Sequence, residues 1–473
     1  MKKEKNVKRK ELICLTQPRT KNKMGVMPVN RLLVSMAAPM MISMLVQALY
    51  NVVDTMFVSR LGKDALTALS LAFSIQNLMI AVAVGTGVGI NALLSRSLGE
   101  KEFERANKTA ENGLFLAGIN YIIFLFIGIF FSRSYFSLFG ASEAVVEYGA
   151  EYLSICCILS FGVFGQITFE RILQSVGKTM LTMVTQMIGA VLNIILDPIM
   201  IYGLLGFPRM GVAGAALATV IGQIIAFIAG IILNHKFNHE VRLNMRSFCP
   251  DGAIIKNIYS VGVPSIIMGS IGSVMTVGIN QIVRICGSVA DTAQAVFGVY
   301  FKLQSFVFMP VFGLNNGMVP IIAYNFGAKK RDRLTKTIKL SVLYACILML
   351  IGFLLFQFMP ETLLRIFDTG NDDMAGIVEV GVPALRRISY SFVFAGFCIV
   401  ILSVFQALGH GFLSLGVSAM RQLGVLLPAA FILAVTTHSV EMVWLAFPIA
   451  EIASVTLSSL CLVHVYKKEI KNL

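Results

Sequence analysis

The sequence predicts an all-α polytopic membrane protein, on the evidence of its composition, the length of its apolar runs and the placement of its basic residues. The chain has 473 residues, of which 56% are hydrophobic and only 14% are charged, with a mean hydropathy of +0.79. Soluble domains carry about 25% charged residues. A chain of this length, roughly three domains if soluble, has too little charge to cover their surfaces.

Twelve apolar runs are long enough to span a bilayer, which takes about 20 predominantly apolar residues. They predict two six-helix bundles, at residues 31–234 and 257–464, joined by a loop at 235–256. A basic tail at 1–30 and a short tail at 465–473 flank the bundles. In chain order the runs lie near residues 32–58, 65–94, 110–132, 152–176, 179–204, 211–234, 257–284, 292–320, 338–360, 387–409, 412–436 and 442–464.

The basic residues test this count. If the N-terminus is cytoplasmic, most of the 39 Lys and Arg residues fall in cytoplasmic tails and loops, and few fall outside, among them Arg386 and Arg387. This asymmetry is typical of membrane topology, and it predicts that both termini are cytoplasmic. The net charge of +14 therefore indicates orientation in a bilayer. We expect no nucleic-acid partner, because no base-reading motif occurs.

The two bundles resemble each other in sequence. Gly327 follows Gly99 by 228 positions, and other pairs match in order at similar offsets. Because the offset spans six helices, the repeat is parallel, as in some secondary transporters. Two such lobes around a central site would permit alternating access. The other matching pairs are Ser35/Ser260, Pro39/Pro264, Gly62/Gly287, Gly85/Gly313, Gly89/Gly317, Gln174/Gln406 and Gly177/Gly409.

Two acidic residues lie within the apolar runs of the first bundle. A stripe on the first helix runs through Met36, Met40 and Met44 to Gln47, Asn51 and Asp54. Asn193 and Asp197 lie one turn apart on the fifth helix. Each Asp lies about 19–23 residues beyond the cytoplasmic end of its helix, so we expect both at similar depth. A charge at mid-bilayer costs about 2.5–3.5 kcal/mol. The pattern predicts a site for a proton or a cation, and Na⁺ is the metal ion that we expect there. The alternative is that each Asp only caps or hydrogen-bonds a neighbouring helix.

Other charged residues in apolar runs allow two interpretations each. Glu170 lies between Gln166 and Gln174 on one face of the fourth helix, where it either takes part in coupling or extends toward the cytoplasmic surface. In the second bundle three charged residues lie about ten residues into their runs, near the midplane. They form either a structural ion cluster or a group that gates substrate. They are Lys302, Arg421 and Glu451.

No pattern of an enzyme is present. The sequence contains no nucleophile with an evident base, no metal-binding spacing and no Walker motif. We therefore expect neither catalysis nor a cofactor, and no ATP-driven pump.

Three segments carry a resemblance to a known family. Residues 52–62 (VVDTMFVSRLG), 95–99 (SRSLG) and 192–198 (LNIILDP) resemble the multidrug and toxic compound extrusion (MATE) family, and its bacterial MepA-like branch in particular. The resemblance implies twelve helices in two pseudo-symmetric six-helix bundles of the MATE/MOP-type fold. It also implies export of organic cations and drugs in exchange for H⁺ or Na⁺, by a monomer in contact with lipids of a bacterial plasma membrane.

The resemblance assigns roles to particular residues. Asp54, Asp197 and Asn193 match positions that the family uses for cation coupling, and Pro39 matches a proline implicated in bending of the first helix. The sequence departs from relatives at Glu170, where they tend to carry Asn. Cation binding is then expected to bend the first helix and displace substrate outward. The alternative is a lipid-linked oligosaccharide or lipid flippase of the same superfamily, whose cavity tends to be basic, as Lys302 and Arg421 would make it.

Overall fold

The computed structural model describes residues 22–139, 142–366 and 374–473, and every regular element within them is a helix. Ten of these helices are long and apolar enough to cross a membrane, and two bent helix pairs complete a set of twelve. The predicted fold class is therefore confirmed. The first six spans comprise α3 (Val29–Ser59), α4 (Lys63–Gly99), α5 (Phe103–Phe130), the pair α7 (Glu143–Ile158) and α8 (Phe161–Ser175), α9 (Thr179–Tyr202) and α10 (Gly211–Phe237).

The second six spans follow the same plan. They comprise α11 (Gly252–Val283), α12 (Ala290–Gly327), α13 (Arg331–Phe358), the pair α15 (Met374–Ser389) and α16 (Phe392–Ala407), then α17 (Gly411–Ala419) with α18 (Leu427–Thr437), and α20 (Ala446–Val465). A π-helical turn, η3 (Met420–Leu426), joins α17 to α18. Short helices include α2 (Lys23–Val26), α6 (Ser132–Ser137), α14 (Pro360–Arg365) and α19 (Val440–Val443).

The fourth and tenth spans begin earlier than predicted, and each consists of two helices with a break between them. The α7–α8 pair is bent by 44° and the α15–α16 pair by 49°. Three exposed acids lower the mean hydropathy of α7, so that composition alone does not identify it as part of a span. They are Glu143, Glu147 and Glu151. Arg386 and Arg387, predicted in an outer loop, instead lie within α15, where Arg387 forms an ion pair of 2.6 Å with Glu441.

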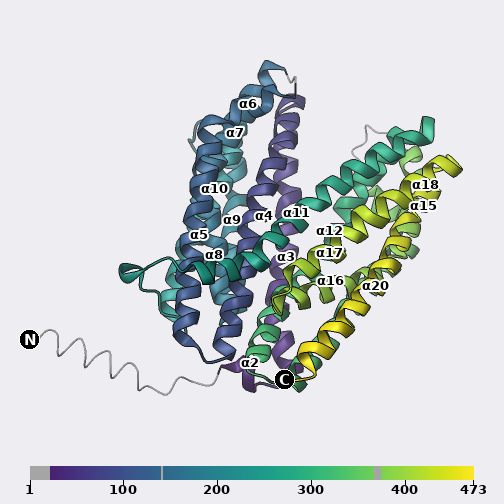
Figure 1. Ribbon diagram of the computed structural model, residues 1–473. Helices are drawn as coiled ribbons and strands as arrows, with labels where there is room; N and C mark the ends of the chain where they lie inside the picture. Colours follow the sequence, from purple (N-terminus) through teal and green to yellow (C-terminus); the bar gives the residue numbers. More distant parts are fainter. Residues whose placement is uncertain (1–21, 140–141, 367–373) are drawn as a thin grey trace, which may run out of the picture.

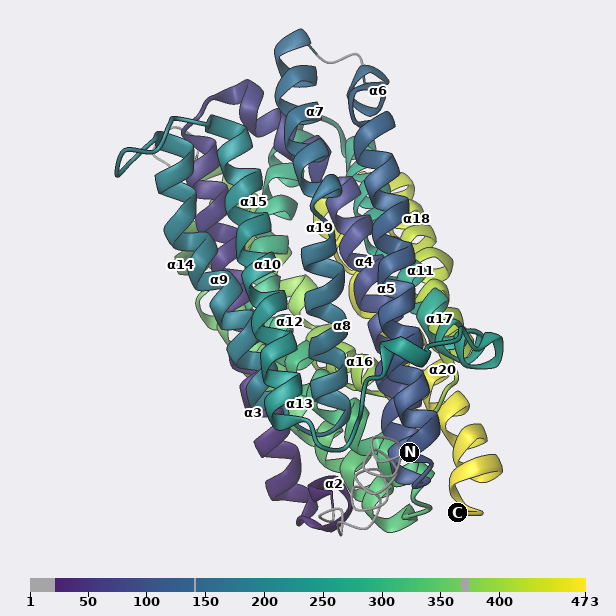
Figure 2. The same ribbon diagram turned by 90° about the vertical axis from the view of Figure 1, so that its left-hand side faces the viewer.

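The helices form two groups that diverge toward one end of the molecule (Figure 1). We call the end that carries α6, α15 and α18 the open end. The opposite end, where α2 and the C-terminal residue lie, is the closed end; both ends are also visible in Figure 2. Between the halves, α3 packs against α12 and α11 packs against α4, so the first helix of each half contacts the second helix of the other.

The closed end is nearly symmetric. A Cβ atom on Gly99 would lie 2.0 Å from the Tyr324 carbonyl oxygen, and one on Gly327 would lie 2.3 Å from the Arg96 carbonyl oxygen. Lys101 and Lys329, which follow these glycines at the same 228-residue offset, both have positive φ, at 64° and 54°. The residue matches found in the sequence therefore place equivalent backbone turns against each other at the contact between the halves.

Candidate functional site

Asp54 and Asp197 are brought together by two adjacent helices, α3 and α9. Each lies five residues before the end of its helix, at Ser59 and Tyr202 respectively, so both lie toward the open end. Their carboxyl groups are in hydrogen-bonding contact. Asp197 is fully buried, whereas Asp54 is half-buried. The expected similar depth of the two acids is therefore what the packing of α3 on α9 produces.

Asn193 orients the Asp197 carboxylate. The amide orientation that satisfies both neighbours directs its nitrogen at Asp197 Oδ2, 3.0 Å away. Its oxygen then accepts from the hydroxyl and the backbone N–H of Thr219 on α10, at 3.1 and 3.3 Å. The acidic pair, Asn193 and Thr219 thus form one polar group contributed by three helices. The carboxylate oxygens of the pair are hard donors, the type that suits Na⁺ or a proton.

Sequence reasoning missed several neighbours of the acidic pair. Tyr50 on α3 and Tyr152 on α7 lie close enough to Asp54 for electrostatic interaction, and Gln76 on α4 donates to the Tyr152 hydroxyl at 3.0 Å. Their only sequence signal was polarity within an apolar run. Among the described residues, Asp54 Oδ1 is buried and accepts no hydrogen bond. This oxygen is free to accept a proton or to ligate a cation.

The rest of the predicted stripe on α3 divides into two parts. Met36 and Met40 are fully buried in the contact between the halves, whereas Gln47 and Asn51 are exposed. Pro39 is buried inside a continuous α3, so the structure contains no break in the helix at the predicted hinge.

Glu170 lies in a separate polar cage. The residue is only 3% exposed, so it does not extend to a surface, and that interpretation of the sequence is wrong. Its carboxylate accepts from Gln166 Nε2 at 2.9 Å, from Thr185 Oγ1 at 3.1 Å and from Gln186 Nε2 at 2.8 Å. Gln186 Oε1 in turn accepts from the Ser43 hydroxyl on α3.

Besides the bond from the Tyr202 hydroxyl to the Phe57 carbonyl oxygen, at 2.8 Å, two side-chain contacts join α3 to α9. Ser43 contacts Gln186, and Asp54 contacts Asp197, each partner lying eleven residues further along its own helix. Eleven residues are three helical turns, a separation of roughly 16 Å at 1.5 Å per residue. Glu170 therefore lies about three helical turns away from the acidic pair, and α3 and α9 are the helices that connect the two sites.

Gln174 lies beside a buried cation, not beside Glu170. Arg171 Nη1 donates to Gln174 Oε1 and to Asn316 Oδ1, both at 3.0 Å. Asn316 belongs to α12, so Arg171 bridges the two halves. Gly87 provides the room, since a Cβ there would lie 2.7 Å from Arg171 Cγ.

The predicted second-bundle cluster is only partly formed. Arg421 Nη1 and Glu451 Oε1 form an ion pair of 2.7 Å, with side chains 20% and 11% exposed. Arg421 lies on the π-helical turn η3, which rotates it toward α20. Lys302 is exposed on α12. The structure thus joins two of the three residues.

Within the part of the chain that the structure describes, no three His, Cys, Asp or Glu residues gather as a metal site. The acidic pair with Asn193 and Thr219 is therefore the candidate cation site. The two carboxylates offer the oxygen ligands, and Asn193 and Thr219 hold the Asp197 carboxylate in place.

Comparisons with known proteins agree with this architecture. The model of the MatE family matches residues 39–199 and 265–432, once in each half. The chain is 27% identical to the multidrug export protein MepA of Staphylococcus haemolyticus, over 84% of this chain and 85% of that protein. It is 25% identical to an FAD transporter of Shewanella oneidensis, over 72% of this chain and 75% of that protein.

Solved structures are similar over almost the whole chain. One is described as the outward-facing conformation of a multidrug resistance MATE family transporter of the MOP superfamily, with a TM-score of 0.89, 25% identity and coverage of 97% of this chain and 100% of that one. Another is a MOP superfamily transporter from Pyrococcus furiosus whose binding pocket is described as having reverse polarity, with a TM-score of 0.86, 25% identity and coverage of 96% and 100%.

Proposed function

Because the chain belongs to the MatE family, a family of transporters and not of enzymes, we propose that it exports organic cationic compounds in exchange for H⁺ or Na⁺ by alternating access. The observation that carries the proposal is the contact between Asp54 and Asp197 on two different helices. An occupied site holds α3 against α9, because a proton or cation offsets the repulsion between the two carboxylates. An empty site destabilises this contact.

Coupling then follows from the position of the pair. A proton or cation that enters from the open end neutralises the acids, and α3 bends near Pro39 so that substrate is displaced. Exchange of one monovalent cation for one H⁺ or Na⁺ moves no net charge, so it is driven by the concentration gradient of the ion alone. Where two ions enter for each monovalent cation exported, one net charge crosses, and 100 mV then adds about 2.3 kcal/mol, or roughly fifty-fold accumulation.

The orientation of the chain supports export. The turns at the closed end are rich in basic residues, which cytoplasmic segments favour. We therefore infer that the closed end faces the cytoplasm, that both termini lie there, and that the molecule opens outward from a bacterial plasma membrane as a monomer in contact with lipid. The basic residues at the closed end include Lys101, Arg105, Lys108, Lys329, Lys330, Arg331 and Arg333.

The relatives inform the substrate class. MepA is named for multidrug export, and this favours organic drugs over one metabolite. A flippase for lipid-linked oligosaccharides would need a basic cavity, and the charge of Arg421 is already neutralised by Glu451. The FAD transporter relative makes an anionic dinucleotide a necessary member of any substrate panel.

Transport in proteoliposomes tests the proposal. Purified protein is reconstituted and offered cationic dyes, FAD and a lipid-linked sugar under separately imposed H⁺ and Na⁺ gradients. We expect dye export driven by one ion, and its loss in Asp54→Asn and Asp197→Asn. Asp64→Asn, at an exposed acid in the first turn of α4, is the matched control. Undiminished gradient-driven export by both site variants would refute the assignment.

A further inference from the structure

The segment Asn22–Met27, which contains the short helix α2, connects the two halves at the closed end. We call it the strap. On the side of the first half, Asn22 Nδ2 donates to Glu240 Oε2 at 2.6 Å and to the Val176 carbonyl oxygen at 3.5 Å. Glu240 follows α10, and Val176 follows α8.

On the side of the second half the strap is held by more bonds. Arg333 Nη2 donates to the Met24 and Met27 carbonyl oxygens at 3.0 and 2.6 Å. Lys330 Nζ donates to the Gly25 carbonyl oxygen at 2.7 Å, and Asn325 Nδ2 to that of Met24 at 3.2 Å. A helix leaves its last carbonyl groups without intrahelical partners, and here cations from the second half satisfy them.

Burial also ties the strap to the second half. Met24 is fully buried and belongs to the apolar core formed mostly by α12, α13 and α16. Gly25 lies against Tyr324, and a Cβ atom on it would be 3.0 Å from the Tyr324 ring.

The first-half contact is weaker by comparison. A cavity of about 360 Å³ separates part of the strap from the first half, and both Lys23 and Lys178 line it. Burial and the nearby Lys178 ammonium lower the pKa of Lys23, so like charges oppose each other on this side. The Glu240 carboxylate, which lines the same cavity and accepts from Asn22, is the group that offsets this repulsion.

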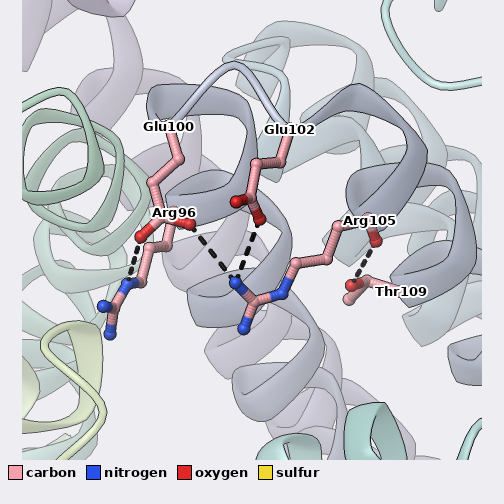
Figure 3. A network of polar contacts seen from close by, with 5 residues as sticks. All are labelled: Arg96, Glu100, Glu102, Arg105 and Thr109. Carbon is pink, nitrogen blue, oxygen red and sulfur yellow. Dashed lines mark hydrogen bonds and ion pairs between the residues drawn. The ribbon is translucent and has the colours of Figure 1, made fainter.

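The adjoining turn of the first half carries a network of ion pairs. Arg96 and Arg105 both pair with Glu100, at 2.8 and 3.4 Å, and Arg105 also pairs with Glu102 at 3.1 Å (Figure 3). Arg96 also lies over the Phe326 ring of the second half, 5.0 Å from its centroid.

We propose that the strap is a latch: it keeps the closed end shut by bridging the two halves, and it leaves the first half together with the second half when the closed end opens. Alternating access requires the halves to part here, so the inference rests on the proposed function. Fixing Asn22 to Glu240 would then arrest the cycle, whereas fixing the strap to the second half would not.

Two cysteine pairs test the latch by transport. Asn22→Cys with Glu240→Cys ties the strap to the first half, and Gly25→Cys with Tyr324→Cys ties it to the second. Both are made in the full chain with Cys14 and Cys249 replaced by Ser, and each single variant is a control. We expect oxidation to abolish dye transport by the first pair, with recovery on reduction, and to spare the second pair. Equal transport by the oxidised and reduced first pair, or arrest by both pairs, would overturn the latch.

A second measurement does not depend on transport. Spin labels at Lys108→Cys on α5 and Lys336→Cys on α13, which correspond in the repeat, report separation of the closed ends. We expect Asn22→Ala to raise the ratio of long to short distances about tenfold, as the loss of a hydrogen bond to a charged group predicts. Glu361→Gln, at an exposed ion pair on α14, is the control. An unchanged distance distribution in Asn22→Ala would contradict the latch even if the protein transports none of the compounds tested.

Discussion

Glu170 and Gln186 are hydrogen-bonded across α8 and α9 at 2.8 Å, and Gln186 passes the connection on to Ser43 of α3. This places the buried Glu170 carboxylate of α8 beside the same two helices that hold the acidic pair, at a level three helical turns from the Asp54–Asp197 contact. The arrangement couples the fourth span to the seam between α3 and α9.

The Glu170 cage predicts different effects of two substitutions. Glu170→Ala leaves the amide donors of Gln166 and Gln186 without an acceptor, each at a cost of about 1–3 kcal/mol, whereas the Thr185 hydroxyl can still donate to the Thr182 carbonyl oxygen at 2.8 Å. Glu170→Gln keeps one acceptor and nearly the same volume. We therefore expect Glu170→Ala to lower the melting temperature in detergent markedly and Glu170→Gln to lower it only slightly. If Glu170 takes part in coupling, both variants lose ion-driven transport; if Glu170→Gln transports normally, its role is structural.

Pro39 predicts an effect on the rate of transport. A proline lacks the N–H that would donate to the Ser35 carbonyl, so α3 is weakened at this point although it is continuous in the structure. Pro39→Ala restores the donor, and we expect a more stable protein with slower dye export. The matched control is Pro264→Ala, at the corresponding position of α11. Equal slowing by both variants would argue against a hinge specific to α3.

The Arg421–Glu451 pair separates a structural from a transport role. Removing Arg421 alone leaves Glu451 buried without its partner and should cost about 3–5 kcal/mol. Replacing both by Met should recover most of that stability, because an apolar pair of similar volume has no charge to desolvate. We measure thermal unfolding and dye export of Arg421→Met, Glu451→Met and the double variant. Transport restored together with stability identifies a structural pair, and stability without transport identifies a gating role.

The symmetric turns predict equal sensitivity at two sites far apart in sequence. Gly99→Ala and Gly327→Ala each place a Cβ within 2.3 Å of a backbone carbonyl oxygen, which forces the halves apart at the closed end. We expect both to reduce folded yield and to increase cysteine accessibility at the closed end. Gly118→Ala, in open surroundings on α5, should be neutral or slightly stabilising. A tolerant Gly99→Ala or Gly327→Ala would disprove the close contact.

Some of the site followed from the sequence, because burial of charge in an apolar run is visible without a structure. Asp54 and Asp197 were identified by this rule, and equal distances along two helices placed them at the same depth. Their coupling role stays a prediction. Tyr50, Gln76, Tyr152 and Thr219 were not identified, since single polar residues in membrane helices are common. Tyr50 lies one turn before Asp54 on α3, and packing brings the other three from α4, α7 and α10 to this region.

The sequence by itself determined the all-helical membrane fold, the number of spans and the repeat, because these depend on composition and spacing along one chain. Only the tertiary structure decided which charges meet: Arg421 pairs with Glu451, Glu170 is enclosed by α9, and Arg171 reaches Asn316 of the other half. The sequence predicted residues 1–30 only as a basic tail, whereas in the structure the segment Asn22–Met27 bonds to both halves. The physical reason is that helix packing joins residues separated by hundreds of positions, and periodicity within a helix carries no information about its neighbour.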